Sequence, residues 1–196
     1  MKLSHLAAQA LAYSLELTGD CEISSLSADS REHSDQGLFF CIKGAHHDAH
    51  QYAEHAIRNG AVALVVTRLL PHLQVPQLLV SDDRAAMALM ARAFYGFADR
   101  QLKLIGITGT KGKTTTSYLV KAILEASGYT VGLIGTTGNM IGQQWMNSTL
   151  TTPDPIELHK TLRQMADARC DIVVMEVSAH ALFMRRLEGL VFEAGC

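Results

Sequence analysis

A strand, a glycine-rich turn and a helix follow one another between residues 102 and 127, and this order constrains the fold more than any other feature. The apolar run LKLIGIT is typical of a central parallel strand that is covered on both faces. The turn GTKGK follows it, and residues 114–127 predict a helix that Gly128 ends. A strand that passes through glycines into a helix indicates a parallel α/β sheet.

The rest of the second half repeats this pattern. TVGLIG and DIVVMEVS predict two more buried strands, GNMIGQQW a hairpin, and VFEAGC the opening of a fourth strand. Asp154 as N-cap and Pro155 at the first helical position predict the start of another helix. We expect the helix at 114–127 to have its apolar side at Leu119, Ala122, Ile123 and Ala126, and the helix after Asp154 to have it at Leu158, Leu162, Met165 and Ala166.

Short apolar runs and helical patterns alternate in the first hundred residues. The predicted helices are 3–17, 48–59 and 82–98, and the predicted strands lie near 23–27, 38–43, 61–67 and 77–80. In the last helix, Met90, Ala93, Phe94 and Phe97 share one face. We therefore predict an α/β protein of two domains: a small mixed α/β domain over 1–100, and over 101–196 the first part of a parallel-sheet phosphate-loop domain, left incomplete by its unfinished last strand.

Composition narrows the class of partner. The net charge of -2 gives no basic field for nucleic acid or anionic membrane, although a local cluster can still bind a small anion. Four widely spaced cysteines without a secretory leader fit a reducing cytosol. No run approaches the roughly 20 apolar residues that a membrane span needs.

The segment GITGTKGKTTT at 106–116 predicts a phosphate-binding loop. Gly109 and Gly112 leave the backbone open to phosphates, Lys113 supplies positive charge, and Thr114 supplies a hydroxyl for magnesium. The usual pattern GxxxxGK[ST] places its first glycine where this chain has Ile107. The alternative is a plain glycine turn before a helix.

Three polar groups outside the loop have both a structural and a functional interpretation. Glu176 lies in the apolar run VVMEVS, so it is either a buried ion-pair partner or a metal ligand. Thr151 and Thr152 precede Pro153 and form either a capped loop or a binding segment. The histidines His46, His47, His50 and His55 suggest zinc, but no Cys, Asp or Glu completes a recognised spacing.

The stretch TGTKGKTTT resembles the ATP signature of the Mur ligases, cytoplasmic enzymes that add amino acids to the peptidoglycan precursor. In that family an aliphatic residue commonly stands at the place of Ile107, and the glycine comes two positions later, as Gly109 does. Residues 27–66, TTPDPIELHKTL and MEVSAHALFMRRL are similar to the branch that adds the third residue of the peptide. The resemblance covers nearly the whole chain, but family members are much longer, which implies a chain that stops inside the central ATPase domain.

The resemblance also implies roles for individual residues. ATP would lie against Thr108, Gly109, Thr110, Lys111, Gly112, Lys113 and Thr114. Thr114 and Glu176 would hold Mg2+, and with Lys113 they would be the catalytic residues present. The uridine diphosphate end would lie against Ala28, Ser30, Gly44, Ala45, His46 and His47, and the rest of the substrate against Thr151, Thr152, Ser178 and Arg186. Met184 stands where the family often has Gln, and His180 is either a substrate-loop residue or a polar helix start.

The implied reaction is phosphoryl transfer followed by acyl transfer. ATP would phosphorylate the free carboxylate of UDP-MurNAc-L-Ala-D-Glu, and the amine of diaminopimelate or lysine would attack the acyl phosphate. The family's carbamylated lysine and carboxy-terminal domain cannot be mapped here, so we expect the chain alone to be inactive. We also expect it to be a monomer. Two alternatives are another Mur-type ligase and a non-catalytic module that binds a UDP-sugar or a nucleotide.

Overall fold

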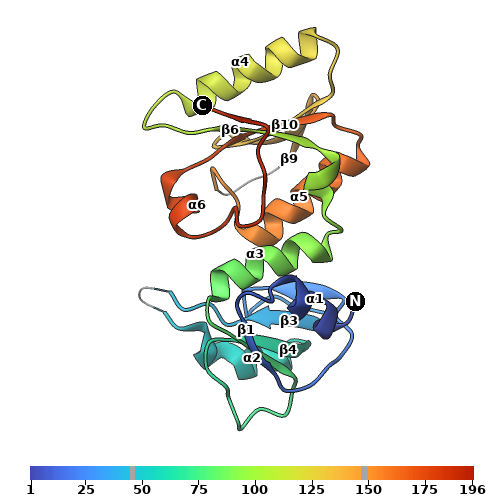
Figure 1. Ribbon diagram of the computed structural model, residues 1–196, viewed down its shortest axis with the longest axis vertical. Coiled ribbons are helices and arrows are strands. Elements are labelled where there is room, and N and C mark those ends of the chain that lie inside the picture. Colours follow the sequence, from blue (N-terminus) through green and yellow to red (C-terminus); the bar gives the residue numbers. More distant parts are fainter. Residues whose placement is uncertain (45–46, 147–149) are drawn as a thin grey trace. The chain divides into compact units, whose positions relative to one another are not determined.

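The computed structural model describes residues 1–44, 47–146 and 150–196. It divides the chain into two compact units, Met1–Phe94 and Tyr95–Cys196, each built around its own sheet (Figure 1). The prediction of a mixed α/β protein with a parallel sheet in its second half is confirmed.

The first unit has a five-stranded sheet in the order β1-β5-β4-β3-β2. Strands β2 to β5 run parallel to their neighbours, and β1 is antiparallel to β5. The strands are β1 (Ser14–Leu17), β2 (Ser25–Ser27), β3 (Gly37–Phe40), β4 (Ala61–Val66) and β5 (Gln77–Val80). The helices are α1 (Leu3–Gln9), the 3-10 helix η1 (Ala49–Tyr52), α2 (Ala53–Arg58) and α3 (Asp83–Phe94).

Helices cover both faces of this sheet. Ala53 and Ala56 of α2 pack against Phe39, Leu64 and Val66, which alternate with the residues of the opposite face. On that opposite face α1 and α3 lie side by side (Figure 1). Strands β3, β4 and β5 are therefore buried between two helical layers, which leaves the carboxyl ends of the parallel strands and the following loops to form a site.

The predicted helix at 3–17 is wrong beyond Gln9. Leu3, Leu6 and Ala10 are buried on one stripe, but that stripe does not continue, because Leu11 and Leu15 are 74% and 66% exposed. Residues Ser14–Leu17 form β1 and pair with β5 instead. Backbone pairing at the edge of the sheet thus outweighs the helical pattern of this segment.

The predicted helix at 82–98 is also too long. Helix α3 ends at Phe94, and Gly96 and Phe97 follow with positive φ angles of 71° and 52°. The left-handed backbone there stops the helix, so Phe97 lies outside the helix that it was expected to share with Met90 and Ala93.

The second unit has a six-stranded sheet in the order β11-β6-β10-β7-β8-β9. The first four strands in this order are parallel, and β8 and β9 form the predicted antiparallel hairpin. The strands are β6 (Lys103–Ile107), β7 (Val131–Gly135), β8 (Gly138–Ile141), β9 (Gln144–Met146), β10 (Ile172–Glu176) and β11 (Ala194–Gly195). The helices are the 3-10 helix η2 (Ala98–Gln101), α4 (Lys113–Ala126), α5 (Pro155–Asp167) and α6 (Ala179–Phe183).

Helix α5 begins as the sequence predicts. The Asp154 carboxylate accepts hydrogen bonds from the backbone N–H groups of Ile156 and Glu157, and Pro155 occupies the first turn. The predicted stripe of α5 packs on the sheet, with Leu158, Leu162 and Met165 fully buried against residues that include Val173 and Met175. Helix α4 covers the other face (Figure 1). Val174 belongs to the buried cluster on that face, against which Val120 and Leu124 of α4 pack.

The predicted orientation of α4 is wrong. Leu119 and Ile123, which were expected to be the apolar side, are 59% and 66% exposed. The buried side carries Ser117 and Lys121, and Lys121 pairs with Glu125 at 2.6 Å. The phosphate loop fixes the start of this helix so that Thr114 faces the sheet, and positions i+3 and i+7 then lie on the same side.

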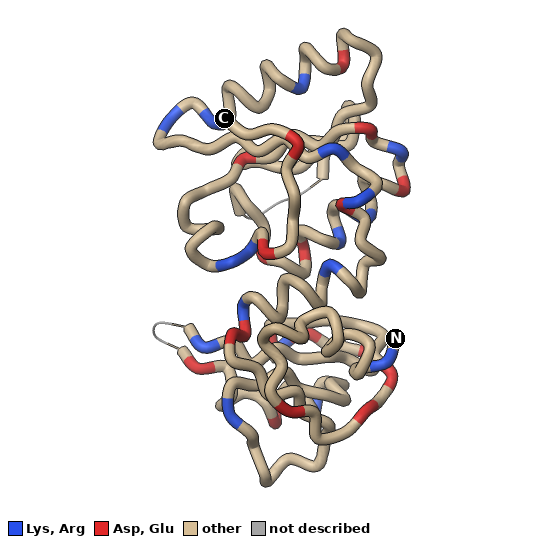
Figure 2. The backbone as a smooth tube through the Cα atoms, in the orientation of Figure 1, with Lys and Arg blue, Asp and Glu red and all other residues tan. Residues whose placement is uncertain are grey.

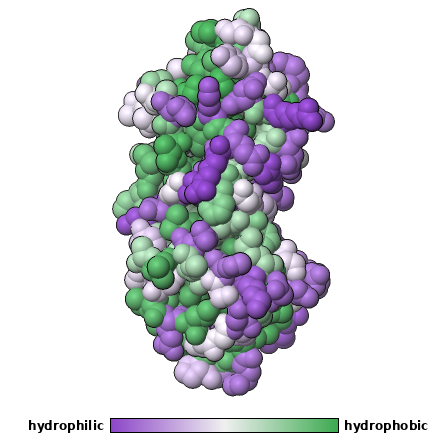
Figure 3. All heavy atoms as spheres, turned by 45° about the vertical axis from the view of Figure 1, so that its right-hand side comes forward, coloured by the Kyte–Doolittle hydropathy of each residue, from purple (hydrophilic) through white to green (hydrophobic). Residues whose placement is uncertain are grey.

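The surface carries both signs of charge. Lys and Arg alternate with Asp and Glu along each unit (Figure 2), and hydrophobic and hydrophilic residues are interspersed on the face drawn in Figure 3. Across the residues described, none of the helices has the length and apolar character that crossing a membrane requires. Because no surface is dominated by one sign of charge in the described residues, the candidate sites are identified from the local arrangement of their side chains.

Candidate functional site

The loop between β6 and α4 brings two glycines with positive φ angles and a lysine to the start of a helix. Gly109 and Gly112 have φ angles of 134° and 82°, a region that glycine adopts without strain. The Nζ atom of Lys113 donates a hydrogen bond to the carbonyl oxygen of Gly109 at 2.8 Å, so the ammonium group lies over the loop. The first amide groups of α4 have no carbonyl partner within the helix and favour negative charge.

Glu176 ends β10 beside this loop, and its side chain is 1% exposed. Its Oε2 atom accepts hydrogen bonds from the hydroxyls of Thr114 and Thr136, each at 3.0 Å. Its Oε1 atom accepts one from the backbone N–H of Thr136 at 3.1 Å. Of the two interpretations of Glu176, these hydroxyl and amide contacts favour a carboxylate oriented by neutral groups over one held in an ion pair.

Gly135 makes this approach possible. A Cβ atom at Gly135 would lie 2.4 Å from Oε1 of Glu176, closer than real side chains approach. The carboxylate therefore occupies the space that a side chain would otherwise take at the end of β7.

The two threonines before Pro153 join the same network. The hydroxyl of Thr152 donates to the backbone carbonyl of Glu176 at 2.8 Å and accepts from the N–H of Ser178 at 3.1 Å. Arg186 donates to the carbonyl of Thr152 at 2.6 Å, and Thr151 meets the hydroxyl of Thr136 at 3.0 Å. The structure thus connects the sequence-predicted residues of the second unit, from the phosphate loop to Arg186.

His180 and Met184 lie at opposite ends of the helical segment α6. His180 is exposed in its first turn, next to Ser178, whose hydroxyl caps the helix by accepting from the N–H of Ala181. Met184 follows as the C-cap residue. Neither enters the hydrogen-bond network that centres on Glu176.

Sequence reasoning missed Thr136. It comes directly after the buried strand TVGLIG, and β7 is the parallel neighbour of β10. The carboxyl ends of parallel neighbours meet at one edge of the sheet, which is where such folds bind ligands. The position of Thr136 directly after a predicted buried strand could therefore have predicted a polar side chain close to Glu176.

The first unit contains a cavity of about 890 Å³ at the carboxyl ends of β2 and β3. Four of the predicted uridine diphosphate residues line it: Ala28, Ser30, Gly44 and His47. The other lining residues are Asp29, Arg31, Phe39, Ile42, Ala49, Gln51, Tyr52, Glu54, His55 and Arg58. Ala45 and His46, which were also predicted to contact the substrate, lie outside the described residues.

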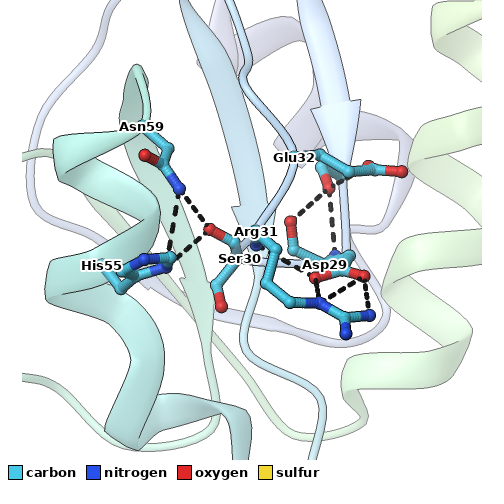
Figure 4. A network of polar contacts seen from close by, with 7 residues as sticks. Asp29, Ser30, Arg31, Glu32, His55 and Asn59 are labelled. Atoms are coloured by element: carbon cyan, nitrogen blue, oxygen red, sulfur yellow. Dashed lines mark hydrogen bonds and ion pairs between the residues drawn. The ribbon is translucent and has the colours of Figure 1, made fainter.

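A polar network holds the cavity wall around Ser30 (Figure 4). The backbone carbonyl of Ser30 accepts from Asn59 Nδ2 at 2.7 Å, and it lies 2.8 Å from Nδ1 of His55, which must carry a proton to donate to it. Arg31 donates hydrogen bonds to the Asp29 carboxylate from two of its nitrogen atoms. These contacts lower the pKa of Asp29 to about 2. At this wall a ligand would therefore meet the hydrogen-bonded main chain of Ser30 and the ion pair of Asp29 and Arg31.

His50 has a structural role. It is 4% exposed, and its Nε2 atom accepts from the backbone N–H of Thr67 at 3.0 Å, so Nδ1 carries the proton that faces Asp48. Burial raises the pKa of Asp48, but hydrogen bonds from Arg68 and His50 outweigh it and hold this pKa well below its usual range. Among the described residues no group of three or more His, Cys, Asp and Glu side chains is arranged to hold a metal ion.

Comparison with protein families gives two matches. Residues 107–196 match the model described as the Mur ligase middle domain, and residues 22–95 match the model described as the Mur ligase family, catalytic domain. The first match begins in the phosphate loop region and the second includes the whole cavity wall.

Curated relatives agree with these matches. The chain is 47% identical over 177 residues to UDP-N-acetylmuramoyl-L-alanyl-D-glutamate--2,6-diaminopimelate ligase 1 of Clostridium acetobutylicum, covering 89% of this chain and 36% of the relative. It is 42% identical over 193 residues to the corresponding ligase of Geobacillus thermodenitrificans, covering 98% and 39%. The chain therefore spans little more than a third of the length of these relatives.

Solved structures share the fold. A structure of UDP-N-acetylmuramoyl-L-alanyl-D-glutamate--2,6-diaminopimelate ligase superposes with a TM-score of 0.78 at 28% identity, covering 88% of this chain and 35% of that one. A MurF ligase from Thermotoga maritima, solved in complex with ADP, gives a TM-score of 0.53 at 23% identity, covering 79% and 32%. The latter supports the fold alone.

Proposed function

Because this chain belongs to the Mur ligase family, we propose that it supplies the nucleotide loop and the UDP-sugar site of a MurE-type ligase. That ligase would join diaminopimelate, or lysine in its place, to UDP-MurNAc-L-Ala-D-Glu with the use of ATP. One observation carries the proposal: Glu176 accepts hydrogen bonds both from Thr114 of the phosphate loop and from Thr152 of the segment Thr151–Thr152. A nucleotide and an acceptor carboxylate must lie close together for phosphoryl transfer, and this network spans both predicted sites.

The residues around Glu176 fit a magnesium ion. Magnesium prefers oxygen ligands in octahedral geometry at roughly 2.0–2.1 Å, which places adjacent ligands about 2.9 Å apart. Oγ1 of Thr114 and Oε2 of Glu176 are 3.0 Å apart. Since Thr114 donates its proton to Glu176, its lone pairs remain for a cation. Bound there, magnesium would offset negative charge on the phosphates.

Each residue of the loop has a defined task in this proposal. The backbone from Thr108 to Thr114 would hold the phosphates of ATP, and Lys113 would lie beside the phosphoryl group as its charge spreads in the transition state. The acceptor carboxylate of the D-glutamyl residue takes the γ-phosphoryl group and ADP leaves. An amine then attacks the acyl carbon, and phosphate leaves as the amide forms.

The cavity of the first unit would hold the uridine diphosphate end of the substrate. Its volume of about 890 Å³ suits a nucleotide-sized ligand. Arg31, His47 and Arg58 line it and offer N–H donors to anionic oxygens. In this proposal residues 1–100 form the UDP-sugar domain, residues 101–196 form the first part of the ATP domain, and the chain acts as a monomer.

Isothermal titration calorimetry tests the proposal in two arms. UDP-MurNAc-L-Ala-D-Glu should bind the chain in the absence of ATP, and ADP with magnesium should bind separately. The longer tripeptide precursor is the control ligand, because tighter binding of the tripeptide would favour another Mur-type ligase. If neither the dipeptide precursor nor UDP gives heat, the proposed function is wrong.

A further inference from the structure

We propose that Thr136 is a positioning residue that sets the orientation of the Glu176 carboxylate for a divalent cation. This inference rests on the function proposed above. Thr136 contacts both carboxylate oxygens, Oε1 through its backbone N–H at 3.1 Å and Oε2 through its hydroxyl at 3.0 Å. Two contacts from one residue fix the plane of a carboxylate that otherwise rotates about its last bond.

The hydroxyl of Thr136 has one proton and two acceptors within reach. Oε2 of Glu176 and the hydroxyl oxygen of Thr151 both lie 3.0 Å from it. A carboxylate is the stronger acceptor of the two, so the Thr136 proton is directed at Glu176.

Thr136 is suited to this task by its place in the fold. It is an exposed residue at the end of β7, while the carboxylate it contacts is buried. Its neighbour Thr137 is exposed too, but the hydroxyl of Thr137 meets the hydroxyl of Tyr118 at 2.8 Å, away from Glu176. Adjacent threonines with different partners provide a matched control.

Manganese titration followed by electron paramagnetic resonance, with ADP present, measures the cation site directly. Thr136→Val keeps the backbone N–H and the shape but removes the hydroxyl, and should weaken Mn2+ binding about tenfold, as expected for a lost hydrogen bond to a charged group. Thr136→Ser and Thr137→Val should stay within about twofold of the wild type. ADP binding in excess EDTA should be the same for all four proteins.

The outcomes separate this inference from the proposed function. Unchanged Mn2+ binding in Thr136→Val would overturn the inference alone. An equal loss of Mn2+ binding and metal-free ADP binding would also overturn it, because the residue would then only support the fold. A wild-type chain that binds no ADP under either condition would overturn the proposed function and this inference together.

Discussion

Oγ1 of Thr114, in the first turn of α4, lies 3.0 Å from Oε2 of Glu176, at the end of β10, although 62 positions separate these residues in the chain. The parallel pairing of β10 with β6 brings them together, since Glu176 stands opposite Ile107, the last residue before the loop. The aliphatic residue at the place of the usual first glycine is thus a buried strand residue, 2% exposed.

Glu176→Gln should remove the effect of magnesium on nucleotide binding. The amide keeps the size of the side chain and its oxygen can still accept from the hydroxyls of Thr114 and Thr136, but its NH2 group only donates, and the side chain lacks the charge that attracts the cation. We expect ADP affinity in magnesium to fall tenfold or more, which is about 1.4 kcal/mol, while ADP affinity in EDTA does not fall. Calorimetry in both buffers measures this, and an unchanged magnesium effect would contradict the assignment.

Lys113→Ala should weaken ADP binding by on the order of tenfold to a hundredfold, because the ammonium group over the loop is lost. Lys103→Ala is the matched control, since Lys103 is exposed at the amino end of β6 and the same charge is removed away from the loop. Calorimetric dissociation constants for the two variants should differ clearly. Equal losses would indicate a general effect of net charge instead of a phosphate contact.

Gly135→Ala should destabilise the second unit, because the new methyl group would lie 2.4 Å from the Glu176 carboxylate. A cost of about 1–3 kcal/mol is expected from overpacking. Gly195→Ala serves as control, as its nearest heavy atom would be 3.7 Å away. Urea unfolding compares the two variants, and similar midpoints would show that the carboxylate moves aside without strain.

Arg31→Gln should raise the pKa of Asp29 from about 2 toward its ordinary value of 3.8. A pKa that is lowered on folding contributes stability above the unfolded value, and this contribution is lost as the pH falls through about 2. The difference in stability between variant and wild type should therefore shrink below pH 4. Carboxyl NMR titration measures the pKa, with Arg58→Gln expected to leave Asp29 unchanged.

The elements that sequence predicts best are those whose signal is local. Asp154 and Pro155 specify a helix start by direct contact with neighbouring amides, and the strand before the phosphate loop is recognisable from its continuous apolar run. For Ser14–Leu17 the deciding partner is β5, which lies more than sixty residues away. Local pattern carries no information about that pairing.

The face that α4 buries was predicted wrongly for a related reason. The helix has apolar residues on more than one side, and hydrophobic periodicity alone favours Leu119 and Ile123. The contact of Thr114 with Glu176 instead turns Ser117 and Lys121 inward. Thr136 escaped notice in the same way, since its significance depends on which strand lies beside which.

The register of three strands also determines when the proposed cation site can form. Glu176 pairs with Ile107, and Met175, the residue before it, pairs with Ile134. A shift of one residue in β10 would turn the carboxylate to the opposite face of the sheet. A β10 strand paired out of this register cannot therefore present the carboxylate to the loop, so affinity for magnesium and ADP should appear only after β6 and β10 have paired in the native register.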